Sequence, residues 1–250
     1  PAPEVLVDLK KIEELVAVAN DGDKWTVGAA TPTANLTEDP AFSEEFPGLA
    51  EAAGLIGSDQ IQNRSSLGGN LCNGSPAADS VPAMVVNGAR AVVAGPNGTR
   101  VLDVAEVVTG PGQTSLAADE FIVEFEIDRI PARTGDAYLR MIPRTEMDIA
   151  VVGAGARITL AEDGSIEHAA LALAAVAPTV VRVPDAEAAL VGNTADDETL
   201  SAVADAASEA CDPIDDKRGT VAYRKQVAGV LAKRAVLIAI ERAQQRNGTN

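Results

Sequence analysis

The sequence has very little of the chemistry on which many catalytic and metal sites depend. Its 250 residues include a single histidine, His168, and two cysteines, Cys72 and Cys211, which are far apart and form no Cys-x-x-Cys motif. This pattern indicates neither a disulfide framework nor a structural zinc or iron–sulfur site. No Gly-x-Ser-x-Gly motif occurs, so a hydrolytic triad would depend on His168 alone. We therefore expect no catalytic side chain, no metal ligand and a structural role for His168.

Positive charge is also scarce. The chain has 20 Lys and Arg against 37 Asp and Glu, which gives a formal net charge of −17. Such a surface has no general attraction for nucleic-acid phosphates or anionic membranes, so neither partner is expected. No run approaches the ~20 apolar residues of a membrane helix, and no signal peptide is visible. Together with the unpaired cysteines, this favours a cytoplasmic protein.

The first half of the chain alternates short apolar runs with turns, a pattern typical of strands and short helices. Thr31 is a candidate helix cap with Pro32 at the first helical position, and Asp79 is expected near the start of another helix. A Pro-Asn-Gly turn between two apolar runs predicts a hairpin. The pattern predicts strands over 4–9, 25–30 and 120–127, helices over 48–57 and 77–89, and the hairpin over 90–102.

The character of the sequence changes near residues 130–137, where a proline and a glycine mark a linker. Beyond it we expect three strands, over 137–142, 149–161 and 166–176. Three helices then follow, over 185–192, 197–210 and 221–246. Strands followed by helices indicate an α+β fold, and we divide the chain into domains over 1–133 and 134–250.

The run "SSLGGNLCNGSPAADS" over 65–80 gathers small and polar residues in one place. One interpretation is a tight turn in which glycine supplies a positive φ. The other is a ligand site, in which Gly68 and Gly69 admit a ligand to the backbone while the flanking side chains bond phosphate or ribose oxygens. The residues alone leave both open. Cys72 has no paired histidine, so a nucleophilic role for it is not favoured.

The longer stretch "NRSSLGGNLCNGSPAADSVPAM" resembles the second flavin-binding motif of the FAD subunit of molybdenum hydroxylases, the family of xanthine and aerobic carbon monoxide dehydrogenases. Four other stretches are similar to that family in the same order. They are "GLAEAAGLIGSDQIQNR", "TGPGQTSLAADEFIVEFEI", "YLRMIPRTEMDIAVVGAGARI" and "DDKRGTVAYRKQVAGVLAKRA". The resemblance covers essentially the whole chain. It implies an FAD-binding domain of the vanillyl-alcohol-oxidase type, followed by a smaller domain of three antiparallel strands and a helical cluster.

The resemblance also implies which residues bind the cofactor. Asp79 matches a ribose partner, Ile122 and Val123 match residues that line the isoalloxazine ring, and Arg140 occupies a position near the flavin that often holds Lys or Arg. A surface ion pair is the alternative for Arg140. The cofactor-binding residues expected on this basis are Ser65, Ser66, Gly68, Gly69, Asn70, Cys72, Ser75, Asp79, Ile122, Val123 and Arg140.

As a family member, the chain is expected to hold FAD and to pass electrons to NAD, a quinone or oxygen. Molybdopterin on a large subunit and two [2Fe–2S] clusters on a small subunit are the expected partners, in a dimer of heterotrimers. Relatives begin with roughly fifty further residues that carry a glycine-rich loop for the FAD pyrophosphate, and since the chain starts at Pro1 without that loop, we expect a processed or partial, N-terminally incomplete chain. A structural subunit that has lost FAD and a stand-alone flavin oxidoreductase are the alternatives.

Overall fold

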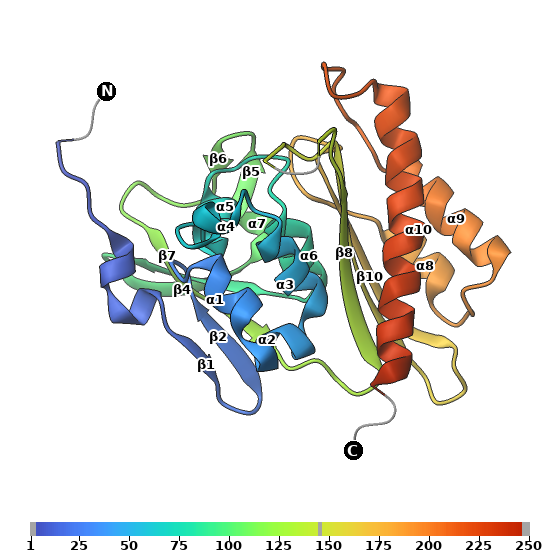
Figure 1. Ribbon diagram of the computed structural model, residues 1–250, viewed down its shortest axis with the longest axis horizontal. Coiled ribbons are helices and arrows are strands. Elements are labelled where there is room, and N and C mark those ends of the chain that lie inside the picture. Colours follow the sequence, from blue (N-terminus) through green and yellow to red (C-terminus); the bar gives the residue numbers. More distant parts are fainter. Residues whose placement is uncertain (1–3, 145–146, 247–250) are drawn as a thin grey trace.

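The first half of the molecule is built on a five-stranded antiparallel sheet. The computed structural model describes residues 4–144 and 147–246, and Figure 1 shows this sheet beside a second, four-stranded one. The strand order is β1-β2-β7-β3-β4, so β7, which comes last in the sequence among these five strands, lies at the centre of the sheet. The strands are β1 (Val18–Asn20), β2 (Lys24–Gly28), β3 (Arg90–Gly95), β4 (Gly98–Asp103) and β7 (Phe121–Asp128).

Short helices connect β2 to β3 and cover one face of this sheet (Figure 1). Their starts follow simple capping rules. Asp39 accepts hydrogen bonds from the N–H groups of Ala41 and Phe42, and Pro40 supplies the fixed φ that suits a first helical residue. The helices are α1 (Thr33–Glu38), α2 (Pro40–Glu45), α3 (Pro47–Gly54), α4 (Asp59–Gln62), α5 (Leu67–Cys72) and α6 (Ser80–Val86). The smaller elements of this half are two 3-10 helices (Leu9–Lys11 and Glu13–Leu15), α7 (Val104–Val107), β5 (Val108–Gly110) and β6 (Gln113–Thr114).

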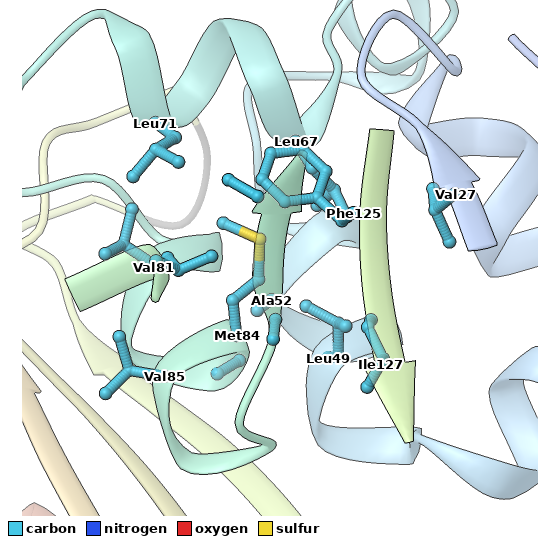
Figure 2. Close-up of a cluster of buried hydrophobic side chains, with 14 of the residues drawn as sticks. Val27, Leu49, Ala52, Leu67, Leu71, Val81, Met84, Val85, Phe125 and Ile127 are labelled. Carbon is cyan, nitrogen blue, oxygen red and sulfur yellow. The ribbon is translucent and has the colours of Figure 1, made fainter. Parts of the chain in front are cut away.

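The core of this half lies between the sheet and the helices. Figure 2 shows Met84 of α6 in the middle of the cluster, with Phe125 and Ile127 of β7 on one side. All three side chains are fully buried. Phe125 and Ile127 are two residues apart, and a strand directs such residues to the same face. The alternation in "FIVEFEI" therefore fixes which face of β7 receives the helices.

The second half is a four-stranded antiparallel sheet with helices on its outer face (Figure 1). Along β9, Ala154, Ala156 and Ile158 are buried in the cluster that the helices cover. Gly155 points to the other face, where a Cβ atom would meet the backbone of Pro82 in α6 at 3.0 Å. The sheet order is β11-β10-β9-β8, with β8 (Thr134–Met141), β9 (Val152–Leu160), β10 (Ile166–Ala174) and β11 (Val181–Arg182), and the helices are α8 (Pro184–Leu190), α9 (Asp197–Glu209) and α10 (Val221–Gln245).

A buried carboxylate joins the two halves. Asp136 of β8 accepts hydrogen bonds from the N–H groups of Gly48 (3.1 Å) and Leu49 (3.2 Å), and from the Asn87 side chain (2.8 Å). It therefore caps the first turn of α3, which has no cap from its own segment. Burial raises the pKa of Asp136, against the opposing effect of these donors. The second half thus supplies a hydrogen-bond acceptor that a helix of the first half needs.

The α+β architecture is confirmed, and the predicted hairpin and long strands are present. The sheet of the second half gains a fourth strand of two residues, β11. The boundary between residues 133 and 134 stays a prediction. Among the helices within 4–144 and 147–246, none combines the length and apolar character that a membrane span requires.

Two local predictions are wrong. Residues 4–8 form no strand, because Val5, Leu6 and Val7 have no neighbouring strand among the described residues and their side chains are at least 70% exposed. Thr31 is not a helix cap, because α1 begins one residue later than predicted, at Thr33, with Pro32 at the cap position. The N–H of Thr31 instead closes a turn onto the carbonyl of Gly28.

Candidate functional site

The glycine-rich run forms a short helix whose start is fixed by its own serine. Ser66 has an extended backbone and its Oγ accepts a hydrogen bond from the N–H of Gly69 at 3.1 Å, so it is the N-cap of α5. A helix rather than a simple turn therefore follows the serine pair. The neighbouring Ser65 faces the protein, where its Oγ lies 2.7 Å from Oγ1 of Thr33 in α1.

The two adjacent glycines have different surroundings. Gly68 is buried against the loop after β2: its N–H donates to the carbonyl of Ala29 at 3.0 Å, and a Cβ atom would lie 2.5 Å from that oxygen. Gly69 is exposed, and a Cβ atom there would meet only Oγ of Ser66, at 3.2 Å. Gly68 is thus required for packing between α5 and the sheet, whereas Gly69 leaves its backbone open to a ligand.

A cavity of about 430 Å³ opens at the start of α5. It brings together five of the predicted site residues, which come from the glycine-rich run and from β7. Most of the remaining wall is aliphatic or aromatic, as in ligand pockets that receive a ring system. The predicted residues on the wall are Ser66, Gly68, Gly69, Cys72 and Ile122, and the others are Asp8, Leu9, Lys10, Leu15, Ala29, Ala30, Arg64, Leu116, Glu120 and Phe121.

Two cations stand on the wall of this cavity. Lys10 donates through Nζ to the carbonyl of Ala30, and Arg64 lies 3.5 Å from the carboxylate of Asp8. Burial, and then the charge of Arg64, lower the pKa of Lys10. Neither cation was among the predicted site residues, although Arg64 belongs to the quoted stretch "NRSSLGGNLCNGSPAADSVPAM"; Lys10 comes from the start of the chain, far from that stretch in the sequence. Cations beside an exposed glycine backbone suit an anionic ligand such as a phosphate.

Asp79 is engaged within the protein. Its Oδ1 accepts from the hydroxyl of Tyr138, and its Oδ2 accepts from Arg140, both at 2.8 Å. The Asp79 and Arg140 side chains are 11% and 6% exposed, so the ion pair is buried and not the surface pair considered as an alternative. Burial raises the pKa of Asp79, with Arg140 and Tyr138 opposing that shift. The pair connects the start of α6 to β8, and Tyr138 was not singled out by the sequence.

The other predicted residues do not share the cavity. Asn70 turns its Oδ1 toward Ser80, accepting from its N–H at 3.2 Å and from its hydroxyl at 2.8 Å. Val123 binds the loop after β2 through its carbonyl, which accepts from the N–H of Ala29 at 2.9 Å. Ser75 lies on a separate cavity of about 450 Å³ between the two halves. Arg140 lines a third cavity, of about 440 Å³, beside α4.

Nucleophilic and metal chemistry receive no support from the geometry. Cys72 lies on the cavity, and desolvation by the surrounding protein raises the pKa of its thiol, which disfavours the thiolate. His168 is exposed on β10. Across residues 4–144 and 147–246, no group of three or more His, Cys, Asp and Glu side chains is arranged to hold a metal ion.

These features fit part of a dinucleotide cofactor such as FAD. The open backbone at Gly69 and the charges of Lys10 and Arg64 suit a phosphate group, and the apolar wall with Phe121 and Ile122 suits a ring. What such a cofactor supplies when bound is redox chemistry at its ring, which leaves the protein to position it and to limit solvent access.

Comparison with known proteins also indicates an FAD-binding protein, and the matches extend over nearly the whole chain. Residues 1–130 match the family described as the FAD-binding domain in molybdopterin dehydrogenase, and residues 137–239 match the C-terminal domain of carbon monoxide dehydrogenase flavoproteins. The chain is 34% identical over 235 residues to the carbon monoxide dehydrogenase medium chain of Hydrogenophaga pseudoflava, covering 94% of this chain and 81% of that one. It is 30% identical over 241 residues to a putative xanthine dehydrogenase FAD-binding subunit of Escherichia coli strain K12, covering 95% and 82%.

Solved structures agree with these relatives. The structure of the Hydrogenophaga pseudoflava carbon monoxide dehydrogenase superposes with a TM-score of 0.88 at 35% identity, over 92% of this chain and 79% of that one. The reconstituted carbon monoxide dehydrogenase of Oligotropha carboxidovorans gives a TM-score of 0.91 at 30% identity, over 96% and 83%. Both sheets and their covering helices therefore have counterparts in a solved fold.

Proposed function

The chain belongs to the family of FAD-binding subunits of molybdopterin dehydrogenases, which are oxidoreductases, and from this premise we propose that it carries FAD as the electron-exit subunit of a heteromeric molybdenum hydroxylase. The family match over residues 1–130 supports the proposal most strongly, because that range contains the whole wall of the cavity at α5. The bound cofactor would take electrons from [2Fe–2S] clusters on a small subunit and deliver them to NAD, a quinone or oxygen.

In this proposal, each part of the cavity has a distinct role. Ser66 fixes the first turn of α5 and thereby holds the Gly69 backbone at the open edge of the cavity. Lys10 and Arg64 offset the negative charge of the phosphates. Ile122 and the other apolar residues exclude water from the ring and supply contact area. None of these side chains has to transfer a proton.

The buried pair of Asp79 and Arg140 has a positioning role in the proposal. Because Tyr138 and Arg140 both belong to β8, the pair holds the end of the flavin motif against the second half of the molecule. The division into domains over 1–133 and 134–250 remains part of the proposal. Asp79 belongs to the first of these domains and Arg140 to the second, so their ion pair joins the two. A contact between Asp79 and the ribose would have to share these carboxylate oxygens.

The assembly around the chain is proposed from its relatives. We expect a large molybdopterin subunit and a small [2Fe–2S] subunit in a dimer of heterotrimers, located in the cytoplasm. Both cysteines are free, as is usual in that compartment.

A matched pair of glycine variants tests the flavin site. Gly69→Ala places a methyl group at the open edge of the cavity, and we expect the affinity for FAD to fall by about tenfold, a loss of about 1.4 kcal/mol. Gly54→Ala is the control, since a Cβ atom there makes an ordinary 3.4 Å contact with Thr37. FAD is titrated into each purified protein and bound flavin is followed by fluorescence quenching, with thermal unfolding measured alongside. Equal flavin affinity in both variants would contradict the placement of FAD at α5.

A further inference from the structure

The outer face of α10 carries a line of exposed apolar side chains. Tyr223, Val230 and Leu237 are 39%, 43% and 41% exposed. They are seven residues apart, which is close to two turns of a helix, so they share one face at a separation of about 10.5 Å. In Figure 1, α10 runs along the outside of the second half, with α8 and α9 beside it. The opposite face of α10 is already buried against β8 and β9 through alanines and aliphatic residues.

Positive charge flanks this line. Successive residues are about 100° apart around a helix, so Lys233 and Arg234 lie on opposite sides of the line between Val230 and Leu237. Neither cation forms an ion pair or a side-chain hydrogen bond within residues 4–144 and 147–246. Two other cations of the helix are used within the protein, because Arg224 is buried against Asp216 and Arg242 pairs with Glu51. Lys233 and Arg234 therefore supply the positive charge of this face, in a chain whose net charge is −17. A basic face on an acidic protein is complementary to an acidic partner.

Apolar residues seven apart share one face of a helix, and the cations on both sides give this face a charge that an acidic partner would complement. We infer that the outer face of α10, defined by Tyr223, Val230, Leu237, Lys233 and Arg234, is the docking surface for an acidic amphipathic helix of a partner subunit. The inference rests on the proposed function, which supplies the partner subunits. The partner helix would present aliphatic side chains to the line and carboxylates to the two cations.

A second copy of this chain fits the surface less well. Lys233 and Arg234 lie at the middle of α10, which spans Val221–Gln245. Pairing two copies of the helix, whether parallel in register or antiparallel about its centre, would bring these cations close to their own counterparts. Like charges held together at an interface weaken it. The charge pattern therefore favours a different chain as the occupant.

The test uses the complex purified with its molybdenum and iron–sulfur subunits. Val230→Glu with Leu237→Glu places carboxylates on the apolar line, and Lys233→Glu with Arg234→Glu reverses the flanking charge. The matched control is Val101→Glu with Val191→Glu, two exposed valines outside α10. The association constant is measured by titrating each variant against the other subunits, and amide hydrogen exchange is followed over residues 221–245 in the free chain and in the complex.

We expect the first double variant to lose at least about tenfold in association constant, which is the loss typical of an interface anchor. The charge-reversed variant should lose affinity in low salt and recover part of it in high salt, as screening weakens the repulsion. The control should bind as the unmodified chain does, and the amides of α10 should exchange more slowly in the complex.

Three results would overturn the inference. One is a Val230→Glu, Leu237→Glu variant that assembles as well as the control, and another is unchanged exchange over 221–245 on assembly. The third is dimerisation of the isolated chain that Leu237→Glu abolishes, since this would identify a second copy as the occupant. The metal and flavin content of the complex distinguishes failure of this inference from failure of the proposed function. A complex that contains Mo, Fe and FAD but leaves α10 uncovered refutes the inference alone. Absence of any Mo or Fe subunit refutes both.

Discussion

Replacing Asp136 with alanine tests how strongly the two halves of the molecule depend on each other. The substitution removes the acceptor for three buried donors, the N–H groups of Gly48 and Leu49 and the side-chain amide of Asn87. A buried donor without an acceptor costs about 1–3 kcal/mol. The loss is partly offset because the variant no longer buries a carboxylate, so we expect the free energy of unfolding to fall by about 3–5 kcal/mol. This is a large part of the roughly 5–15 kcal/mol that stabilises a typical protein.

Two further variants separate this effect from a general loss of charge. Asp136→Asn keeps the shape and one acceptor oxygen but turns an amide toward the donors, and we expect a loss of about 1–2 kcal/mol. Asp128→Ala removes an exposed carboxylate that pairs with Arg90, and we expect a change of about 0–1 kcal/mol.

Urea unfolding provides the measurement. The only tryptophan, Trp25, is buried in the first half and reports its unfolding by fluorescence. Circular dichroism at 222 nm reports helical content, to which the 25-residue α10 of the second half contributes strongly. Coincidence of the two transitions supports a two-state analysis. An Asp136→Ala variant within about 0.5 kcal/mol of the unmodified protein would refute the role assigned to this carboxylate.

Two more predictions concern packing and pH. Gly68→Ala should destabilise the protein by about 1–3 kcal/mol in urea unfolding, because the new methyl group would lie 2.5 Å from the Ala29 carbonyl oxygen. If Gly68→Ala were as stable as Gly69→Ala, the packing role of Gly68 would be contradicted. The N–H of Arg218, and then the Arg224 guanidinium, lower the pKa of Asp216 from 3.8 to about 2. The stabilisation from this carboxylate should therefore be present above pH 3.8 and lost as the pH falls toward 2. In Asp216→Asn, the free energy of unfolding should depend less on pH between these values. An equally steep fall in the free energy of unfolding in both proteins would contradict this prediction.

Most of the regular elements could be predicted from the sequence, because their signals are local. The Pro-Asn-Gly turn fixes the hairpin of β3 and β4, and two-residue alternation fixes β7. The strand predicted over 4–9 is wrong because a strand exists only where a neighbouring strand pairs with it, and the alternation in Val5 to Val7 says nothing about that neighbour.

The site was predicted only in part, for the same physical reason. Four residues of the glycine-rich run share one cavity with Ile122, whereas the rest of that run does not line it. Contacts between distant segments carry no local signature. Asp79 is bonded to side chains about 60 positions away, on β8, and Lys10 reaches the cavity from the start of the chain. The different roles of Gly68 and Gly69 likewise depend on where Ala29 lies, not on the glycines themselves.

The most direct test of the proposed function is the visible absorption spectrum of the purified complex, with quantification of the flavin that it releases on denaturation and of its Mo and Fe. The proposal predicts a flavin band, one FAD for each copy of this chain, and both metals on the other subunits. A complex that contains Mo and Fe but releases no FAD would contradict it and would identify the chain as a structural subunit. A chain that carries FAD without those partners would instead be a stand-alone flavoprotein.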